Sequence, residues 1–339
     1  MKLTKCLHRF FGYYLTGIKG LSPNTLQVYQ ETFAIFLPFA ARYRSCTVQT
    51  LKIEHIDTEL VVDFLEYLEK SRNNGVRTRN LRLASLKSLA KMIRLLYPEL
   101  RKYGDCILLI PQKRAQKKLI GYLHQEEILA IMSRVDLQKK EGMRDYAILN
   151  LLLDSGARAS EIAGLTLDYF DYQHQTIALL GKGNRFRQVG LWPKTVDLLK
   201  EYIKQYRRQP RFGNAHWLFI NQRGEQFTRH GIYRICKKYL QAVLPQKRMA
   251  VLNPVHSFRH SCAMNMLANG AAITEIRNRL GHENINSTMV YLKMEMRQKR
   301  EVQKQFLQYT SSLLSEDPQI EKLTAWNNDK EILAWLDTL

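Results

Sequence analysis

Apolar residues recur every three or four positions through much of the first 110 residues. Residues 22–43, 58–71 and 76–97 each show this spacing, which predicts three amphipathic helices. The first predicted helix begins at a Ser-Pro pair, and the third ends before Pro98. The pattern therefore predicts an α-helical domain over residues 1–110.

The second half of the chain mixes helical spacing with one stretch of strand pattern. Residues 175–192 place β-branched and aromatic residues on both sides of a Gly-Lys-Gly-Asn turn, which is typical of a β-hairpin. Helices are expected from about His124, over residues 144–165 with a break at Gly156, and over 193–207 and 228–243. The predicted fold class is mainly α with a small antiparallel β-sheet.

A basic, Pro-containing segment separates the two halves. It contains Lys113, Arg114, Lys117 and Lys118 and no acidic residue, and we interpret residues 111–121 as an extended linker that follows a phosphate backbone. Charge supports this interpretation, because the 339 residues include 52 Lys and Arg against 31 Asp and Glu, a net charge of +21. Such a surplus favours a nucleic acid as partner, and we expect double-stranded DNA.

Two predicted helices carry the candidate DNA contacts outside the linker. On residues 76–97 and 228–243, basic and amide side chains gather on the polar side. The alternative is a solvated basic face, but the net charge favours a helix in the major groove, with some side chains near base edges and others on phosphates. The candidates are Arg77, Arg79, Asn80, Arg82 and Lys87 on the first helix, and Arg229 and Arg234 on the second.

Other features set the compartment and the end of the chain. Five separated cysteines without a CxxC pair indicate reduced thiols in a cytoplasmic protein, with neither a disulfide framework nor a zinc site. We expect no signal peptide and no membrane partner, because no apolar run reaches the length of a membrane span. Residues 301–339 form an acidic amphipathic tail, suited to docking on this chain's own body or on a neighbouring subunit.

Six polar residues of the second half stand out. Each has an ordinary explanation: Arg158 pairs with Glu161 on a helix, for example, and Tyr291 is a core aromatic. Together they fit phosphodiester cleavage, whose transition state gathers negative charge that fixed cations stabilise. Two arginines fork onto the phosphate oxygens, a lysine protonates the leaving 5′ oxygen, and a tyrosine assisted by histidine attacks phosphorus. The six are Arg158, Lys182, His256, Arg259, His282 and Tyr291.

In order and spacing these residues resemble the tyrosine recombinase (phage integrase) family. The resemblance rests on Arg158, Lys182, the HxxR pair His256/Arg259, and LGH followed nine residues after its His by Tyr291. It covers roughly residues 5–295, and implies an α-helical core-binding domain (1–110), a basic linker (111–121), an α+β catalytic domain (122–300) and the tail (301–339).

The resemblance also implies a mechanism. The tyrosine takes a DNA 3′ phosphate covalently, the two arginines and His282 bind that phosphate, Lys182 is the general acid, and His256 acts in proton transfer. No metal, ATP or other cofactor takes part. Family members act as homo-tetramers on paired sites through a Holliday junction, with accessory DNA-bending proteins or sister recombinases as possible partners. Two departures, Ala157 and Arg185, remove no catalytic group. The long tail favours an integrase or transposase of a mobile genetic element.

Three alternatives remain. A type IB topoisomerase uses a similar residue set, although the close spacing of His282 and Tyr291 favours a recombinase. A catalytically silent DNA-binding regulator would not need all six groups. A metal-dependent nuclease has least support, because His256 and His260 flank Arg259, which repels a cation. The target DNA sequence, and the choice among integration, excision and resolution, do not follow from the sequence.

Overall fold

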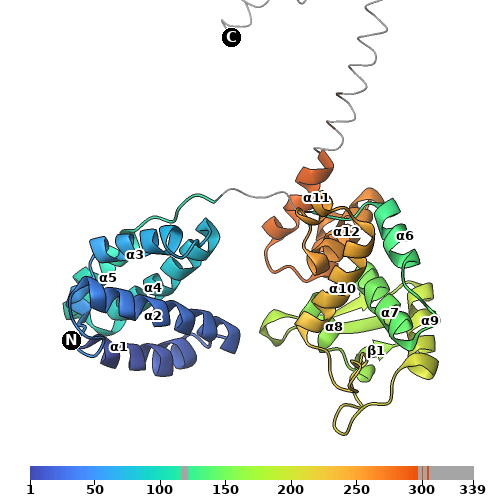
Figure 1. Ribbon diagram of the computed structural model, residues 1–339, viewed down its shortest axis with the longest axis horizontal. Coiled ribbons are helices and arrows are strands. Elements are labelled where there is room, and N and C mark those ends of the chain that lie inside the picture. The colour runs from blue at the N-terminus through green and yellow to red at the C-terminus, as the bar shows by residue number, and fades with distance from the viewer. Residues whose placement is uncertain (116–120, 297–299, 301–303, 305–339) are drawn as a thin grey trace, which may run out of the picture. The chain divides into compact units, whose positions relative to one another are not determined.

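The computed structural model describes residues 1–115, 121–296, 300 and 304. The chain divides into two compact units, Met1–Lys118 (unit 1) and Leu119–Leu339 (unit 2) (Figure 1). Within the described ranges, no helix is both long and apolar enough to cross a membrane. Three predicted features, Lys117, Lys118 and nearly all of the tail, lie outside the described residues.

Unit 1 is a bundle of helices around α4. This helix contacts α5, α3, α2 and the π-helical segment η1, so it lies in the middle of the unit. Its bounds and those of its neighbours are α1 Leu3–Arg9, η1 Phe10–Ile18, α2 Pro23–Tyr43, α3 Thr58–Lys70, α4 Val76–Leu96 and α5 Arg101–Leu109. The three helices predicted from apolar spacing are confirmed, whereas α5 was not predicted.

The core of unit 1 follows from that spacing. Phe33 and Phe36 of α2 are buried one helical turn apart, and Phe36 packs edge-on against Phe64 of α3 with ring centroids 5.1 Å apart. The start of α3 is fixed by Asp57, whose carboxylate accepts the backbone N–H of Leu60 at 2.9 Å. Aromatic packing therefore joins α2 to α3, and one N-cap fixes where α3 begins.

Unit 2 combines helices with one small sheet. The sheet is antiparallel, in the order β1-β2-β3, and pairs Ile177 with Val189 across β2 and β3. The strands are β1 Phe170–Asp171, β2 Thr176–Leu180 and β3 Phe186–Gly190. The helices are α6 Gln125–Ser133, α7 Lys140–Ser155, α8 Ala159–Ala163, α9 Pro193–Glu201, α10 Arg229–Val243, α11 Gln246–Met249, α12 Pro254–Ala268 and α13 Ile273–Leu280. The predicted hairpin and fold class are confirmed.

Two glycines end the helices that lead into the polar centre of unit 2. Gly156 ends α7 with φ of 61°, and Gly281 ends α13 with φ of 65°, a region that favours glycine. A Cβ on Gly156 would lie 2.6 Å from the side chain of Leu280, and one on Gly281 would lie 2.9 Å from that of Arg187. The chain can therefore reverse at both points while the segments stay in close contact.

Candidate active site

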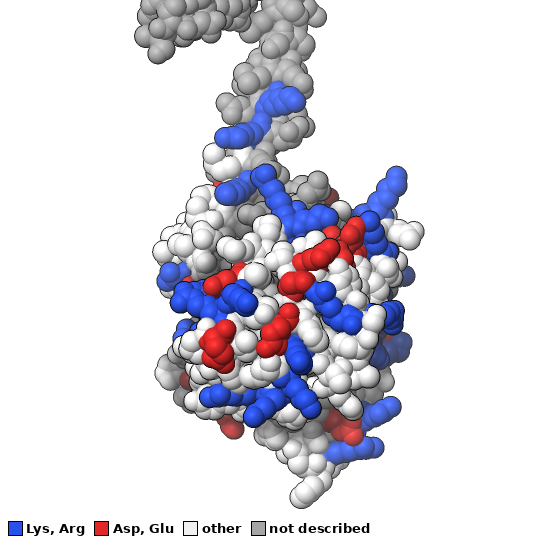
Figure 2. All heavy atoms as spheres, turned by 90° about the vertical axis from the view of Figure 1, so that its left-hand side faces the viewer, with Lys and Arg blue, Asp and Glu red and all other residues white. Residues whose placement is uncertain are grey.

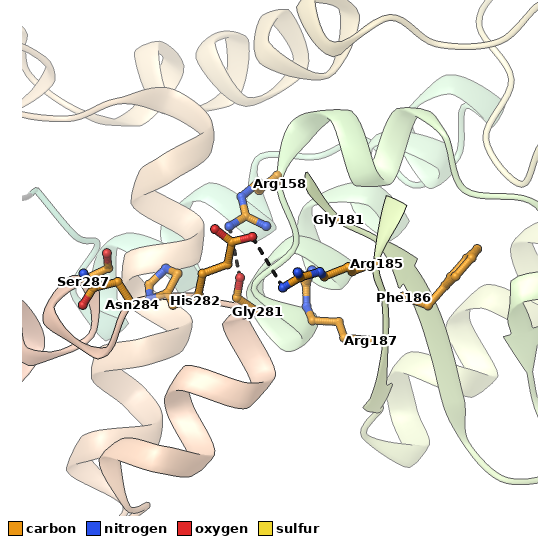
Figure 3. Close-up of a pocket in the computed structure, with 10 residues that line it drawn as sticks. Arg158, Gly181, Arg185, Phe186, Arg187, Gly281, His282, Asn284 and Ser287 are labelled. Atoms are coloured by element: carbon orange, nitrogen blue, oxygen red, sulfur yellow. Dashed lines mark hydrogen bonds and ion pairs between the residues drawn. The ribbon is translucent and has the colours of Figure 1, made fainter. Parts of the chain in front are cut away.

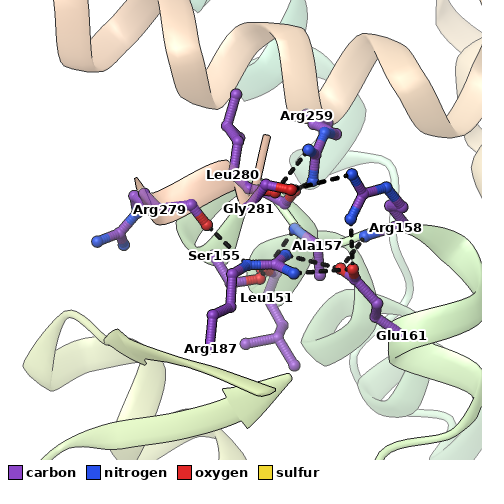
Figure 4. A network of polar contacts seen from close by, with 11 residues as sticks. Leu151, Ser155, Ala157, Arg158, Glu161, Arg187, Arg259, Arg279, Leu280 and Gly281 are labelled. Atoms are coloured by element: carbon purple, nitrogen blue, oxygen red, sulfur yellow. Dashed lines mark hydrogen bonds and ion pairs between the residues drawn. The ribbon is translucent and has the colours of Figure 1, made fainter. Parts of the chain in front are cut away.

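The ends of α7 and α13 meet the start of α12 at one polar centre. Figure 4 shows Arg158, Arg187 and Arg259 around these chain ends, with Glu161 among them. Segments 123 residues apart in sequence are joined here, because Arg158 Nη2 donates to the carbonyl oxygen of Gly281 at 3.4 Å. Three of the predicted residues, Arg158, Arg259 and His282, therefore flank a common region.

Arg158 is held by a buried carboxylate. Glu161, whose side chain is 1% exposed, accepts the backbone N–H of Arg158 at 2.8 Å and its Nη1 at 2.7 Å. Arg187 of β3 binds the same carboxylate through both Nη atoms, at 2.8 and 2.7 Å. Burial alone would raise the pKa of Glu161, but the hydrogen bonds and charge of Arg187, followed by those of Arg158, lower it to about 2.

Arg187 also connects this carboxylate to the end of α13. Its Nε donates to the carbonyl oxygen of Arg279 at 2.9 Å, near the end of α13. Because Arg187 belongs to the strand that follows Lys182, one guanidinium links the hairpin, the start of α8 and the end of α13. Glu161 and Arg187 thus fix the frame of the site.

Arg259 is the most deeply buried of the predicted residues that carry charge. It is 3% exposed, and its two Nη atoms donate to the carbonyl oxygens of Gly156 and Leu280, each at 2.6 Å. Burial and the charge of Arg158 lower its pKa to about 10, so it remains a cation at neutral pH. A guanidinium carries five N–H groups, so these two hydrogen bonds leave donors for an anion.

His282 follows Gly281 and is oriented by a buried hydroxyl. Its Nδ1 lies 3.0 Å from Oγ1 of Thr288, which is 0% exposed. Burial, and then the charges of Arg259 and Arg158, lower the pKa of His282 to about 4, so the ring is neutral at neutral pH. With Nδ1 bound to the hydroxyl, Nε2 is the ring atom left to meet a ligand.

Tyr291 is buried and bonded to a histidine that the sequence interpretation did not assign to the site. Only 1% of its surface is exposed, and its hydroxyl lies 2.8 Å from Nδ1 of His260. The rings of Tyr291 and His282 stack at a centroid distance of 6.5 Å. Burial raises the pKa of Tyr291 to about 12, although the charge of Arg259 acts in the opposite direction.

Two of the six predicted residues stand apart from these contacts. Lys182 begins the turn Lys182–Asn184 between β2 and β3, and its side chain lies outside what the structure describes. His256 is exposed near the start of α12, where the cap is Asn253, which accepts the backbone N–H of His256 at 3.2 Å. Partial burial of its ring and the charges of Arg259 and Arg158 lower the pKa of His256.

Two hollows border the centre, and Arg158 lines both. The first has a volume of about 380 Å³ and is lined by Arg158, Arg185, Arg187 and His282, together with Glu283, which pairs with Arg185 (Figure 3). The second, of about 300 Å³, is lined by Arg158, His256 and Arg229. The first therefore offers cations and a neutral imidazole to an anion of phosphate size.

The candidate DNA contacts of unit 2 remain free for a ligand, whereas several of those in unit 1 are already bound. Arg229 and Arg234 are exposed on α10. On α4, Asn80 accepts the backbone N–H of Lys113 at 3.0 Å and donates to its carbonyl oxygen at 2.7 Å. These bonds hold the start of the predicted linker against α4.

Other side chains of α4 take part in the same arrangement. Lys87 donates to the carbonyl oxygen of Leu108 at 2.7 Å, and Arg79 to that of Pro111 at 3.4 Å. Lys113 pairs with Glu69 of α3 at 3.0 Å. Arg82 is partly buried, and Arg77 and Arg114 are exposed. A base-reading role for Asn80 or Arg79 would require these contacts to be exchanged for DNA.

One face of the molecule shows no gathering of positive charge. In the face drawn in Figure 2, Lys and Arg are scattered among Asp and Glu and form no continuous basic area. Within the described residues, no group of three or more His, Cys, Asp and Glu side chains is placed to hold a metal ion.

Four residues of the site were missed as participants by the sequence interpretation. Glu161 was considered only as an ordinary partner of Arg158, and His260 only as a metal ligand. Arg187 and Thr288 were not singled out. A partial signal existed for His260, which directly follows Arg259, and for Glu161, which is a carboxylate one turn after Arg158.

Comparisons with known proteins show what the chain is similar to. The chain matches the phage integrase family over residues 121–298, and the N-terminal SAM-like domain of phage integrases over residues 8–94. It is 30% identical over 344 residues to a putative integrase/recombinase, y4rC, of Sinorhizobium fredii, which covers 99% of this chain and 98% of that protein.

Two further matches extend the comparison. Tyrosine recombinase XerD of Staphylococcus haemolyticus is 31% identical over 297 residues, covering 85% of this chain and 94% of that one. Among solved structures, the Tn1549 transposon integrase in complex with transposon right end DNA aligns with a TM-score of 0.65 at 17% identity. That alignment covers 86% of this chain and 94% of the other, and it shows a shared fold.

Proposed function

Because the chain belongs to the phage integrase family of tyrosine recombinases, enzymes that cleave and rejoin DNA strands, we propose that it is a site-specific recombinase of the integrase or transposase type. Its substrate is double-stranded DNA. The observation that carries the proposal is that Arg158 and His282 line one hollow, Arg259 is bonded to the chain ends behind it at Gly156 and Leu280, and the ring of Tyr291 stacks on that of His282.

The chemistry assigned to these residues is transfer of a DNA strand to the protein. Tyr291 attacks the scissile phosphorus, so that a bond forms from its Oη to phosphorus and the bond to the 5′ oxygen breaks. Arg158 and Arg259 bind the non-bridging oxygens, and His282 adds a hydrogen bond through Nε2. Lys182 gives a proton to the leaving 5′ oxygen.

The product is a 3′-phosphotyrosyl link that keeps the energy of the phosphodiester. A 5′ hydroxyl from another strand attacks this link by the reverse chemistry, so that no ATP or metal is required for rejoining. Two such exchanges, through a Holliday junction, recombine two sites. The neutral His256 serves proton transfer at the same phosphate, from the side of the second hollow.

DNA binding, chemistry and assembly are assigned to different parts of the chain. Residues 1–110 and the linker, 111–121, bind DNA, residues 122–300 carry out the chemistry, and four copies assemble on two paired sites. Exposed Arg229 and Arg234 supply phosphate contacts on α10. Arg77, Arg82 and Arg114 supply those of unit 1. Residues 301–339, which lie outside the described residues apart from Lys304, dock on this chain's own body or on a neighbouring subunit.

A suicide-substrate assay tests this proposal. Duplexes that the protein selects from a randomised library would be prepared with a single nick at each successive position, and incubated in EDTA with wild type and with Tyr291→Phe. We expect a protein–DNA adduct on a denaturing gel with wild type only, and equal DNA affinity for both proteins.

Three results separate the alternatives. An adduct that still forms with Tyr291→Phe would show that another residue is the nucleophile. An adduct followed by relaxation of supercoiled plasmid, without strand exchange between two sites, would favour a topoisomerase. Binding without any adduct would favour a DNA-binding regulator.

A further inference from the structure

We propose that His260, rather than His256, takes the proton of the Tyr291 hydroxyl when this tyrosine attacks DNA. The proposal rests on the proposed function, and it assigns a catalytic role to a residue outside the six predicted ones. His260 follows Arg259 directly on α12, so the same helix turn would hold both the phosphate and the proton acceptor.

The geometry of the contact carries this assignment. Nδ1 of His260 lies 2.8 Å from Oη of Tyr291, within the distance at which a base removes a proton from a nucleophile. Within the part of the chain that the structure describes, His256 makes no hydrogen bond to that oxygen. Its ring instead lies against that of His260, with centroids 6.1 Å apart and planes 25° apart.

The protonation states fit a donor phenol and an acceptor imidazole. Burial, followed by the charges of His256, Arg259 and His282, lowers the pKa of His260 to about 3, so the ring is neutral at neutral pH. The pKa of Tyr291 is raised to about 12, so its hydroxyl keeps its proton. The phenol therefore donates and Nδ1 accepts, and the imidazole proton resides on Nε2.

The two values also explain when the proton moves. From a phenol of pKa about 12 to an imidazole of pKa about 3, transfer is strongly unfavourable in the protein alone. DNA changes the pKa of both groups. The negative charge of the phosphate raises the pKa of His260, and the phenolic proton becomes acidic as the oxygen bonds to phosphorus. The Tyr291 proton thus passes to Nδ1 only during the attack.

The full step balances. The bond from Oη to phosphorus forms, the bond from phosphorus to the 5′ oxygen breaks, the phenolic proton goes to Nδ1 of His260, and the 5′ oxygen takes a proton from Lys182. His260 leaves the step as an imidazolium and returns its proton to Oη when the link is resealed. The titratable groups that act on it are His256 and Arg259 on its own helix, and His282 and Tyr291 from other segments.

Two substitutions separate proton acceptance from simple positioning. His260→Asn keeps an acceptor oxygen close to the position of Nδ1, but an amide cannot take up a proton. His260→Phe keeps a ring in the buried site and removes the acceptor. His174→Asn is the matched control, because His174 is exposed in the β1–β2 turn, away from the site.

The rate of adduct formation would be measured in a single turnover on the nicked duplex, with the protein in excess. We expect both His260 variants to bind DNA as wild type does and to form the adduct about 10²–10⁴-fold more slowly, the usual contribution of a general base. Thermal melting would show that the variants are folded. If His260→Phe fails to fold, His260→Asn carries the test.

A second substrate identifies which proton is affected. Sulfur in place of the leaving 5′ oxygen departs without protonation, since thiols have pKa values of about 8.5. This substrate should restore the rate of Lys182→Ala and leave both His260 variants slow.

Each other result has a definite meaning. A wild-type or faster rate for His260→Asn overturns the assignment, and so does rescue of the His260 variants by sulfur. If wild type itself forms no adduct, or Tyr291→Phe forms one, the proposed function fails instead.

Discussion

The polar centre of unit 2 and the basic helix α4 of unit 1 use arginine in opposite ways. In unit 2, Arg259 is 3% exposed and is fixed by two carbonyl oxygens at 2.6 Å. On α4, Arg77 is exposed and Asn80 holds the backbone of Lys113. A buried charge is costly unless fixed partners hydrogen-bond it, whereas a surface charge is solvated wherever it lies.

This difference explains why the sequence predicts the residues of the polar centre more specifically than the DNA contacts of α4. The buried centre needs particular residue types at particular spacings, because each group is fixed by others from distant segments. A basic helix surface imposes no such requirement, because the same side chains can contact DNA, water or a neighbouring loop. Four experiments test the contrast, starting with the largest expected effect.

Removal of the buried arginine should have the largest effect on the reaction. Arg259→Ala should lower the single-turnover rate of adduct formation by about 10³-fold, or about 4 kcal/mol, because a fixed donor to the transition-state charge is lost. Arg211→Ala is the control, since this arginine forms an exposed pair with Glu225. A loss smaller than tenfold in a folded Arg259→Ala protein would contradict the assigned role.

The two arginines of the hairpin offer a matched pair for stability. Arg187→Ala leaves Glu161 buried with one cation and should lower the free energy of unfolding in urea by about 3 kcal/mol. Arg185→Ala removes a 3.8 Å pair with Glu283, between side chains that are 77% and 62% exposed. It should change the free energy of unfolding by less than about 1 kcal/mol. Equal effects would mean that Arg187 does not form the frame of the site.

Low pH should destabilise the protein by protonating the buried carboxylate of Glu161. The pKa of Glu161 is lowered from 4.5 to about 2, so its contribution to stability is present above pH 4.5 and is lost as pH falls towards 2. Over that range wild type should lose at most about 3 kcal/mol more than Glu161→Gln, which has no such group to titrate. Protonation of the buried neutral histidines at low pH should destabilise wild type and Glu161→Gln equally, so it cancels in the comparison. Parallel curves of unfolding free energy against pH would refute the assignment.

The smallest effects are expected on α4, where two neighbours should behave differently. Asn80→Ala should speed trypsin cleavage after Lys113 and Arg114 a few-fold, because it frees the backbone of Lys113. Arg77→Ala should leave cleavage unchanged, weaken DNA binding uniformly across sequences, and reduce the salt dependence by about one counterion. Reversed phenotypes would mean that Asn80 reads DNA and Arg77 does not.

Much of the fold followed from local pattern, and the misses share a cause. The helices α2, α3 and α4 and the hairpin were predicted because their apolar residues repeat at a regular period. The two-residue strand β1 is too short to show a period, and it is defined by its pairing with β2. The short helix α5 lies against α4 and depends on that contact.

The candidate site shows the same limit. The candidate cations, histidines and nucleophile are of residue types that phosphodiester cleavage needs, so their types and order could be found in the sequence. Their supports could not, because Arg187 reaches Glu161 from another element and Thr288 meets His282 only after a 3₁₀ turn, Ile285–Ser287. The hydroxyl of Tyr291 contacts His260, one helical turn after the predicted His256, and no spacing in the sequence indicates that contact.

The central claim is that Tyr291 becomes bonded to a DNA 3′ phosphate, and mass spectrometry of the adduct tests it most directly. Trypsin releases this tyrosine in the peptide of residues 280–293, LGHENINSTMVYLK, which contains no other tyrosine. After nuclease digestion of the bound strand, we predict that this peptide carries a nucleotide attached through phosphate to Tyr291. A nucleotide found on any other residue, or an unmodified peptide from an adduct band, would contradict the account.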